Sequence, residues 1–216
     1  MNLILHGYWR SSAAYRVRIG LNLKGLSYRQ VSHDLRIGEQ SAPSYRAISP
    51  AGLVPALDTG EQTLTQSLAI LEWLEELHPE PALLPLDATA RADVRAMAGI
   101  VASDIHPLNN LRVLNALRKD FAATPDAVQG WIARWIGDGF AALEAMVQRH
   151  GGAYCFGDSP TIADCCLIPQ IYNARRFSVD LSAFPALLAV DQRCAADDAF
   201  SLAAPDHQPD AEPSAT

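Results

Sequence analysis

The stretch that decides the fold is residues 8–19, YWRSSAAYRVRI, near the start of the chain. It follows a short apolar run at residues 3–5, and its apolar side chains recur at helical spacing as far as Leu21. This pattern predicts a strand, a tight loop and a helix that begins near Ser11 and Ser12. Serines at such a junction lie beside unpaired backbone N–H groups and the positive end of the helix dipole. The pair is therefore either a site for an anion such as a thiolate or a simple helix cap, and both interpretations fit this stretch equally well.

The surrounding residues 1–78 alternate between strand-like and helix-like segments, which is typical of an α/β unit. We expect a strand at 3–7, a helix to about 23, a strand at 28–31, a hairpin over 53–64 and a helix over 66–77. Pro55 interrupts the strand-like run 53–58, because proline has no N–H to donate to a sheet. The Val54–Pro55 bond therefore lies either at a sheet edge or at a position with a special role, where it can be cis.

Residues 79–87 carry three prolines and form the natural boundary between a first domain, 1–80, and a second domain, 88–204. The second domain has helical periodicity throughout, with helices expected at about 89–118 and 125–149, a third that opens at Thr161, and a further one at about 183–196. The spacing of Thr161 and Asp164 predicts a capping box with a role in folding, and Pro169 should kink the helix that follows. Residues 205–216 hold three prolines and no aromatic residue, and we expect them to be disordered.

Composition excludes several classes of function. A chain of 216 residues, 49% hydrophobic and 19% charged, can bury a substantial core. Its net charge of −7 gives no basic face for nucleic acid, and no apolar run approaches the length of a membrane span. The start of the chain lacks the features of a signal peptide, so we expect a cytoplasmic protein. The four cysteines show no metal-ligand spacing, so we expect buried free thiols and no metal site.

Several motifs together resemble the soluble glutathione transferases over residues 1 to about 204. Residues 53–57, LVPAL, resemble the strand with a cis-proline in that family, and Gln66-Ser67 resembles its Gln/Glu-Ser pair. Residues 161–164, TIAD, resemble its capping motif. More narrowly, residues 10–21, RSSAAYRVRIGL, resemble the signature of the zeta class, as do residues 104–112 and 174–181. The resemblance implies an α/β thioredoxin-like N-terminal domain followed by an all-α C-terminal domain, in a homodimer.

The zeta class contains maleylacetoacetate and maleylpyruvate isomerases, so the resemblance implies glutathione as cofactor and a dicarboxylate keto acid as substrate. In that chemistry a thiolate adds to the maleyl alkene, the bond rotates, and elimination gives the fumaryl isomer. Ala13 replaces the cysteine of the class signature and Tyr15 replaces its tryptophan, but glutathione brings the reacting sulfur. Leu111 stands where maleylpyruvate isomerases can place an arginine, which favours maleylacetoacetate. A conjugating transferase and a transferase-like binding module without activity are the alternatives.

The candidate site residues follow from this resemblance and from the charge of the substrate. An acidic protein that binds a dianion needs converging arginines, and we expect Arg10 and Arg176 to supply them beside Ser11 and Ser12. His106 is either an acid or base or a hydrogen-bonded structural residue. Asp104 is expected to meet the γ-glutamyl ammonium, often across a dimer interface in this family. The expected glutathione contacts are Ser11, Gln40, Val54, Pro55, Gln66, Ser67, Asp104, His106, Asn110 and Arg112.

Overall fold

The computed structural model describes residues 2–212, which divide into two compact units. The first, called here the α/β unit, combines Met1–Leu83 with Ala195–Thr216, and the second, the helical unit, is Leu84–Cys194. The boundary near residue 83 agrees with the proline-rich linker. The expected second domain of 88–204 is wrong at its far end, because residues 195–204 belong to the first unit.

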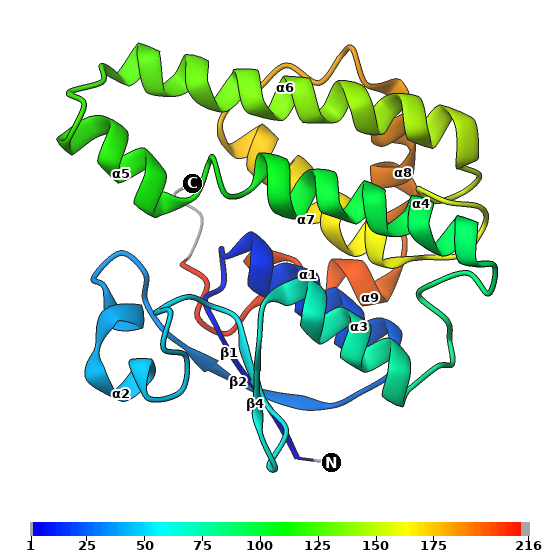
Figure 1. Cartoon of the computed structure of the whole chain (residues 1–216), viewed down its shortest axis with the longest axis horizontal. Coiled ribbons are helices and arrows are strands. Elements are labelled where there is room, and N and C mark those ends of the chain that lie inside the picture. The colour runs from blue at the N-terminus through cyan, green and yellow to red at the C-terminus, as the bar shows by residue number, and fades with distance from the viewer. Residues whose placement is uncertain (1, 213–216) are drawn as a thin grey trace. The chain divides into compact units, whose positions relative to one another are not determined.

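A mixed four-stranded sheet in the order β2-β1-β3-β4 forms the centre of the α/β unit (Figure 1). Its strands are β1 (Leu3–Gly7), β2 (Tyr28–Ser32), β3 (Ala56–Asp58) and β4 (Thr63–Thr65). The first two strands are parallel, whereas β3 runs antiparallel to both β1 and β4. This topology confirms the thioredoxin-like fold expected from the sequence.

Helices α1 (Ser12–Leu23) and α3 (Ser67–Leu77) pack against each other beside this sheet. A Cβ atom on Gly20 would lie 2.3 Å from Leu71 Cδ2, so a glycine is needed at this close approach. The short helix α2 (Pro43–Arg46) lies in the connection between β2 and β3. Strand β3 begins only after Pro55, and the Val54–Pro55 peptide bond is cis.

The helical unit contains α4 (Ala88–Gly99), α5 (Leu111–Lys119), α6 (Pro125–His150) and α7 (Ile162–Arg176), and α8 (Pro185–Ala195) follows them. The single helix expected over 89–118 is wrong, because α4 continues as a π-helical segment, Ile100–Ile105, and the chain then turns before α5. Pro107 lies two residues after the end of that segment and has no N–H with which to continue a helix. Asn110 then starts α5 as its N-cap, with Oδ1 accepting from the Arg112 N–H at 3.2 Å.

The capping box expected at the start of α7 is present. Thr161 Oγ1 accepts from the Ala163 N–H at 3.2 Å, and Asp164 Oδ2 accepts from the Thr161 N–H at 2.7 Å. The Cys155 N–H also donates to Asp164 at 2.8 Å, which ties the preceding loop to the helix. These contacts confirm a structural role for Asp164. All four cysteines are buried and free, as expected.

The C-terminal segment belongs to the α/β unit and includes α9 (Asp198–Ser201) and a 3-10 turn, Pro205–His207. Gln208 is buried, and its Nε2 donates to the carbonyls of Leu202 at 2.9 Å and Ala204 at 2.8 Å. The expected disorder from residue 205 onwards is therefore wrong for 205–212, because side chains of this segment bind the rest of the unit. Residues 213–216 of that prediction lie outside the described residues. No helix within the described residues is long and apolar enough to cross a membrane.

Candidate active site

Ser11 is the N-cap of α1, and its hydroxyl is only partly used by that role. Its backbone is extended, with φ −70° and ψ 116°, and its Oγ accepts from the Ala14 N–H at 3.2 Å. The Ser11 N–H donates to the Tyr8 carbonyl at 2.9 Å, which closes a tight turn over residues 8–11. A serine hydroxyl has one proton to donate besides its two acceptor lone pairs. Ser11 can therefore cap the helix and donate to an anion at once, so the two interpretations of this serine do not exclude each other.

Arg10 and Ser12 flank Ser11 in different environments. The Arg10 guanidinium lies 5.1 Å from the centre of the Trp9 ring and forms no ion pair with another described residue. It thus keeps its charge available for an anionic ligand. Ser12 is the first residue of α1 and is buried, which makes it a weaker candidate than Ser11 for direct contact with a ligand.

The segment before β3 offers an open backbone edge at Val54. Neither the N–H nor the C=O of Val54 bonds to another described residue. The preceding carbonyl, that of Leu53, is held by Tyr45 Oη at 2.8 Å and by Ser49 Oγ at 3.0 Å. Burial raises the pKa of Tyr45 to about 12, so this phenol stays a hydrogen-bond donor at neutral pH. The edge is therefore anchored on one side and free to pair with an extended peptide.

Gln66 and Ser67 lie at the start of α3, as expected. Gln66 has φ 69° and ψ 114°, an unusual backbone conformation for a residue other than glycine. Such strain is concentrated at ligand sites in proteins. Ser67 is buried, and its Oγ accepts from Arg16 Nη1 at 3.2 Å. The first turn of α3 thus presents unpaired backbone N–H groups and a serine hydroxyl, which suits a carboxylate.

Gln40 lies against the same loop. A Cβ atom on Gly52 would stand 3.0 Å from the Gln40 carbonyl, and Gly52 has a φ of 62° that favours glycine. The Oε1 atom of Gln40 is buried and has no hydrogen-bond partner among the described residues. Gln40 is thus close to the segment that leads to Val54.

The remaining candidates lie in the helical unit, so their part in one site with Ser11 stays a prediction. Asp104 and Arg112 are exposed, and His106 is half-buried directly after the π-helical segment. Asn110 already serves as the N-cap of α5, which gives it a structural role. Arg176 ends α7, where its guanidinium stacks 4.2 Å from the centre of the Phe177 ring.

Tyr8, Trp9 and Asp210 are not among the site residues predicted from the sequence. Tyr8 is 4% exposed and Trp9 is 7% exposed, and neither Tyr8 Oη nor Trp9 Nε1 has a hydrogen-bond partner within residues 2–212. Buried polar atoms without partners are rare in proteins and indicate a place for a ligand or water. The sequence contained one signal for Tyr8 and Trp9, which is that they directly precede Arg10 and Ser11. Asp210 lay in the tail that was expected to be disordered.

Comparisons with known proteins agree with this architecture. The family model of the glutathione S-transferase N-terminal domain matches residues 5–82, and the family model of the C-terminal domain matches residues 129–196. A maleylpyruvate isomerase from Ralstonia sp is 52% identical, covering 95% of this chain and 98% of that protein. The chain therefore belongs to the glutathione S-transferase family, and its relatives place it in the zeta class.

Two solved structures of relatives are closely similar. The holo structure of a maleylpyruvate isomerase, described as a bacterial zeta-class glutathione transferase, has a TM-score of 0.95 and 51% identity, covering 97% of this chain and all of that one. A maleylacetoacetate isomerase from Anaeromyxobacter dehalogenans 2CP-1 has a TM-score of 0.88 and 49% identity, covering 98% of both chains. That protein was crystallised with dicarboxyethyl glutathione and citrate in its active site.

Proposed function

We propose that this chain is a glutathione-dependent isomerase that converts a maleyl keto acid into its fumaryl isomer. The observation that carries the proposal is the Ser11 hydroxyl, which caps α1 with its oxygen and has a proton left to donate to a thiolate. The Anaeromyxobacter relative, with a dicarboxylate joined to glutathione in its active site, supports the same chemistry. Glutathione, when bound, supplies the thiolate that adds to the maleyl alkene and leaves again after rotation about the former double bond.

The α/β unit offers contacts for each part of glutathione. The open backbone of Val54, before Pro55, suits the peptide of the cysteinyl residue, and the start of α3 at Gln66 and Ser67 suits the γ-glutamyl carboxylate. The unpartnered Oε1 of Gln40 offers an acceptor beside this loop. In the helical unit, Asp104, His106, Asn110 and Arg112 are proposed as lesser contacts.

The task of Ser11 is to keep the thiol ionised at neutral pH. A free thiol has a pKa of about 8.5, and lowering it by one unit takes about 1.4 kcal/mol. A helix terminus contributes about 0.3 to 1 kcal/mol, and a hydrogen bond to a charged acceptor contributes about 1.5 to 3 kcal/mol. The helix terminus alone lowers the thiol pKa by less than about one unit, whereas the hydrogen bond lowers it by about one to two units and is the larger contribution. We assign the hydrogen bond to Ser11, with Ser12 as the second choice.

The arginines hold the substrate, which is a dianion in a protein of net charge −7. Arg10 adjoins Ser11 and forms no ion pair with a carboxylate of the described residues, so it can bind a substrate carboxylate. We propose that Arg176 binds a second carboxylate or the enolate oxygen that develops during the reaction. Because Leu111 stands where maleylpyruvate isomerases can place an arginine, we propose maleylacetoacetate as the preferred substrate and maleylpyruvate as the alternative.

We further propose that the protein is a cytoplasmic homodimer. The four buried free thiols suit a reducing compartment, and dimerisation follows from the family resemblance. Measuring the mass in solution at micromolar concentration tests the second point, and a monomer would contradict it.

The decisive experiment follows the ultraviolet absorbance of maleylacetoacetate and of maleylpyruvate with and without glutathione. We expect turnover only with glutathione, whose concentration stays constant because it is regenerated. Consumption of one glutathione per substrate would instead indicate a conjugating transferase. Glutathione binding without any turnover would indicate a binding module.

A further inference from the structure

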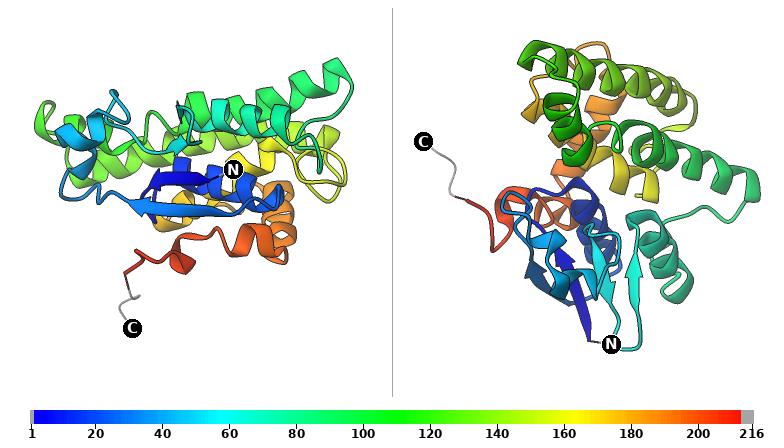
Figure 2. Two further views of the ribbon diagram at one scale, coloured as in Figure 1. Left: turned by 90° about the horizontal axis from the view of Figure 1, so that it is seen from below. Right: turned by 60° about the vertical axis from the view of Figure 1, so that its left-hand side comes forward.

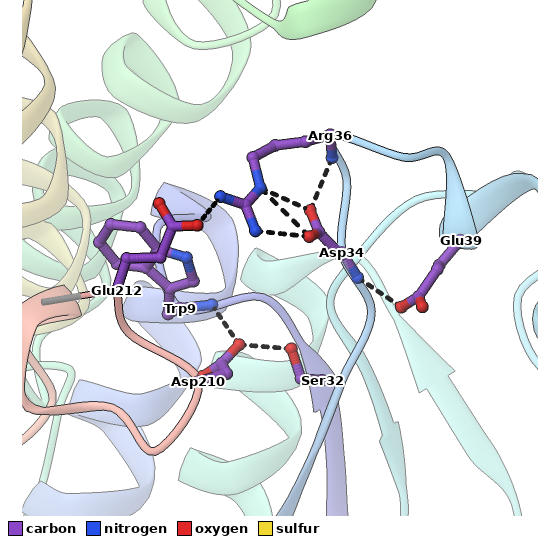
Figure 3. A network of polar contacts seen from close by, with 7 residues as sticks. All are labelled: Trp9, Ser32, Asp34, Arg36, Glu39, Asp210 and Glu212. Carbon is purple, nitrogen blue, oxygen red and sulfur yellow. Dashed lines mark hydrogen bonds and ion pairs between the residues drawn. The ribbon is translucent and has the colours of Figure 1, made fainter.

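The C-terminal segment of the chain binds the loop that precedes Ser11. We call residues 202–212 the C-terminal strap. Its Asp210 carboxylate uses both oxygens: Oδ2 accepts from the Trp9 N–H at 3.0 Å and Oδ1 accepts from Gln30 Nε2 at 3.0 Å. Ser32 Oγ also donates to Oδ2, so Asp210 connects the loop to strand β2 (Figure 3). Both views in Figure 2 show this red segment beside the blue N-terminal strands.

The strap also fixes the other side of the Trp9 residue. Arg18 of α1 donates from Nη2 to the Trp9 carbonyl at 2.9 Å and from Nε to the Ala203 carbonyl of the strap at 2.8 Å. Trp9 therefore has its N–H bound by Asp210 and its C=O bound by an arginine that the strap orients. Because Trp9 and Arg10 are the two central residues of the turn closed by Tyr8 and Ser11, these bonds set the course of the turn.

Within the strap, Asp210 is the carboxylate that carries this contact. Glu212 forms an ion pair with Arg36, which also binds Asp34 (Figure 3). That cluster is exposed, and exposed ion pairs contribute little to stability. Asp210 is half-buried and accepts a backbone N–H and two side-chain donors. Its replacement by asparagine weakens the bond to the turn, because a neutral amide accepts less strongly than a carboxylate and turns an NH2 group towards one of the donors.

We propose that Asp210 is a positioning residue for Arg10 and Ser11, and that the C-terminal strap is in this way a working part of the glutathione site. This inference rests on the proposed function. Without the Asp210 carboxylate the turn samples other conformations, and the apparent affinity for glutathione falls by the fraction of molecules that still hold the competent turn. Saturating glutathione selects that competent turn, so kcat should change much less than the KM for glutathione.

The test compares Asp210→Asn with Glu212→Gln, which removes the same charge from the exposed end of the same strap. Calorimetry should show glutathione binding weakened about tenfold by Asp210→Asn and less than twofold by Glu212→Gln. The KM for glutathione should rise by a similar factor in Asp210→Asn, with kcat within about twofold of wild type. A merely structural role would lower the melting temperature without moving the affinity of the folded protein.

The outcomes separate the two proposals. If the wild-type protein binds no glutathione, the proposed function fails and this inference fails with it. If wild type binds glutathione and folded Asp210→Asn binds it equally well, only the inference is overturned. If Asp210→Asn does not fold, the double variant Gln30→Ala/Ser32→Ala decides, since it removes two of the three donors to Asp210. We expect a two- to threefold weaker affinity from that variant, and an unchanged affinity would overturn the inference.

Discussion

Arg16 of α1 donates from Nη1 to Ser67 Oγ at 3.2 Å, which ties the start of α3 to the helix that begins after Ser11. The Arg16 side chain is almost completely buried, with 2% exposed, so this bond lies inside the α/β unit. Ser67 and Ser11 share one property, since the oxygen of each accepts a bond from the protein while the proton remains to be donated. Two helix starts, each with an available hydroxyl, are thus prepared for two anionic groups.

The Ser11→Ala variant should show two separate losses. Removal of the hydroxyl raises the pKa of bound glutathione by about one to two units, so activity is partly recovered at high pH. Removal of the cap lowers the free energy of unfolding by about 1 kcal/mol. Titration of thiolate absorbance checks the first loss and chemical denaturation checks the second. Ser11→Gly is the control, because glycine caps helices nearly as well but has no hydroxyl; an unshifted thiol pKa in both variants would contradict the assignment.

The Arg176→Ala variant should behave differently, because raising the pH cannot replace a positive charge. We expect a loss of about 2 to 4 kcal/mol in transition-state stabilisation, seen as a lower kcat/KM for the maleyl substrate, while the thiol pKa stays nearly constant. Arg175→Ala is the matched control, since Arg175 precedes it on α7 and binds Asp191 at 2.5 Å. Equal effects of the two substitutions would show that Arg176 has no special role.

The pair His6 and His33 predicts how stability depends on pH. His6 Nδ1 lies 2.9 Å from His33 Nε2, a hydrogen bond that requires at least one neutral ring. Burial lowers the pKa of both residues, and their mutual repulsion lowers that of His6 further, although Asp58 and Glu39 oppose these shifts. Because the unfolded chain then binds more protons, the free energy of unfolding should fall as the pH drops below about 6.5.

Denaturation curves between pH 5 and pH 8 measure this dependence in wild type and in His33→Gln. We expect a shallower slope in the variant, because one of the two rings that resist protonation is gone. His6→Gln removes the other ring of the pair and should make the slope shallower in the same way. A slope that is unaffected by His33→Gln would contradict the prediction.

The buried ion pair at the edge of the α/β unit predicts a large loss of stability in Glu75→Ala. Glu75 Oε2 accepts from Lys24 Nζ at 2.6 Å and from the Leu83 N–H at 2.8 Å, and the Lys24 side chain has no exposed area. Removing the carboxylate leaves a buried ammonium group without its charge partner, at a cost of about 3 to 5 kcal/mol. Chemical denaturation checks this value. Glu76→Ala, at the exposed neighbouring position, should change stability by less than about 0.5 kcal/mol.

Local patterns accounted for most of the elements but not for their limits. The apolar period after residue 8 predicted α1, and the Thr161 and Asp164 spacing predicted the capping box of α7, since both depend on residues within a few positions of each other. The break between α4 and α5 was missed, because the helical period continues through residues 106–110 although Pro107 and the Asn110 cap interrupt the backbone pattern.

The sequence by itself determined the two-part architecture, the helix start at Ser11 and the candidate contacts at Val54, Gln66 and Ser67, because each has a signature within a short stretch. Only the tertiary structure decided that the C-terminal strap is ordered against the α/β unit. Its polar composition indicated disorder, yet Asp210 binds Trp9 across 201 positions of sequence. The free energy that orders such a segment comes from partners that are distant along the chain, so composition within the segment does not reveal it.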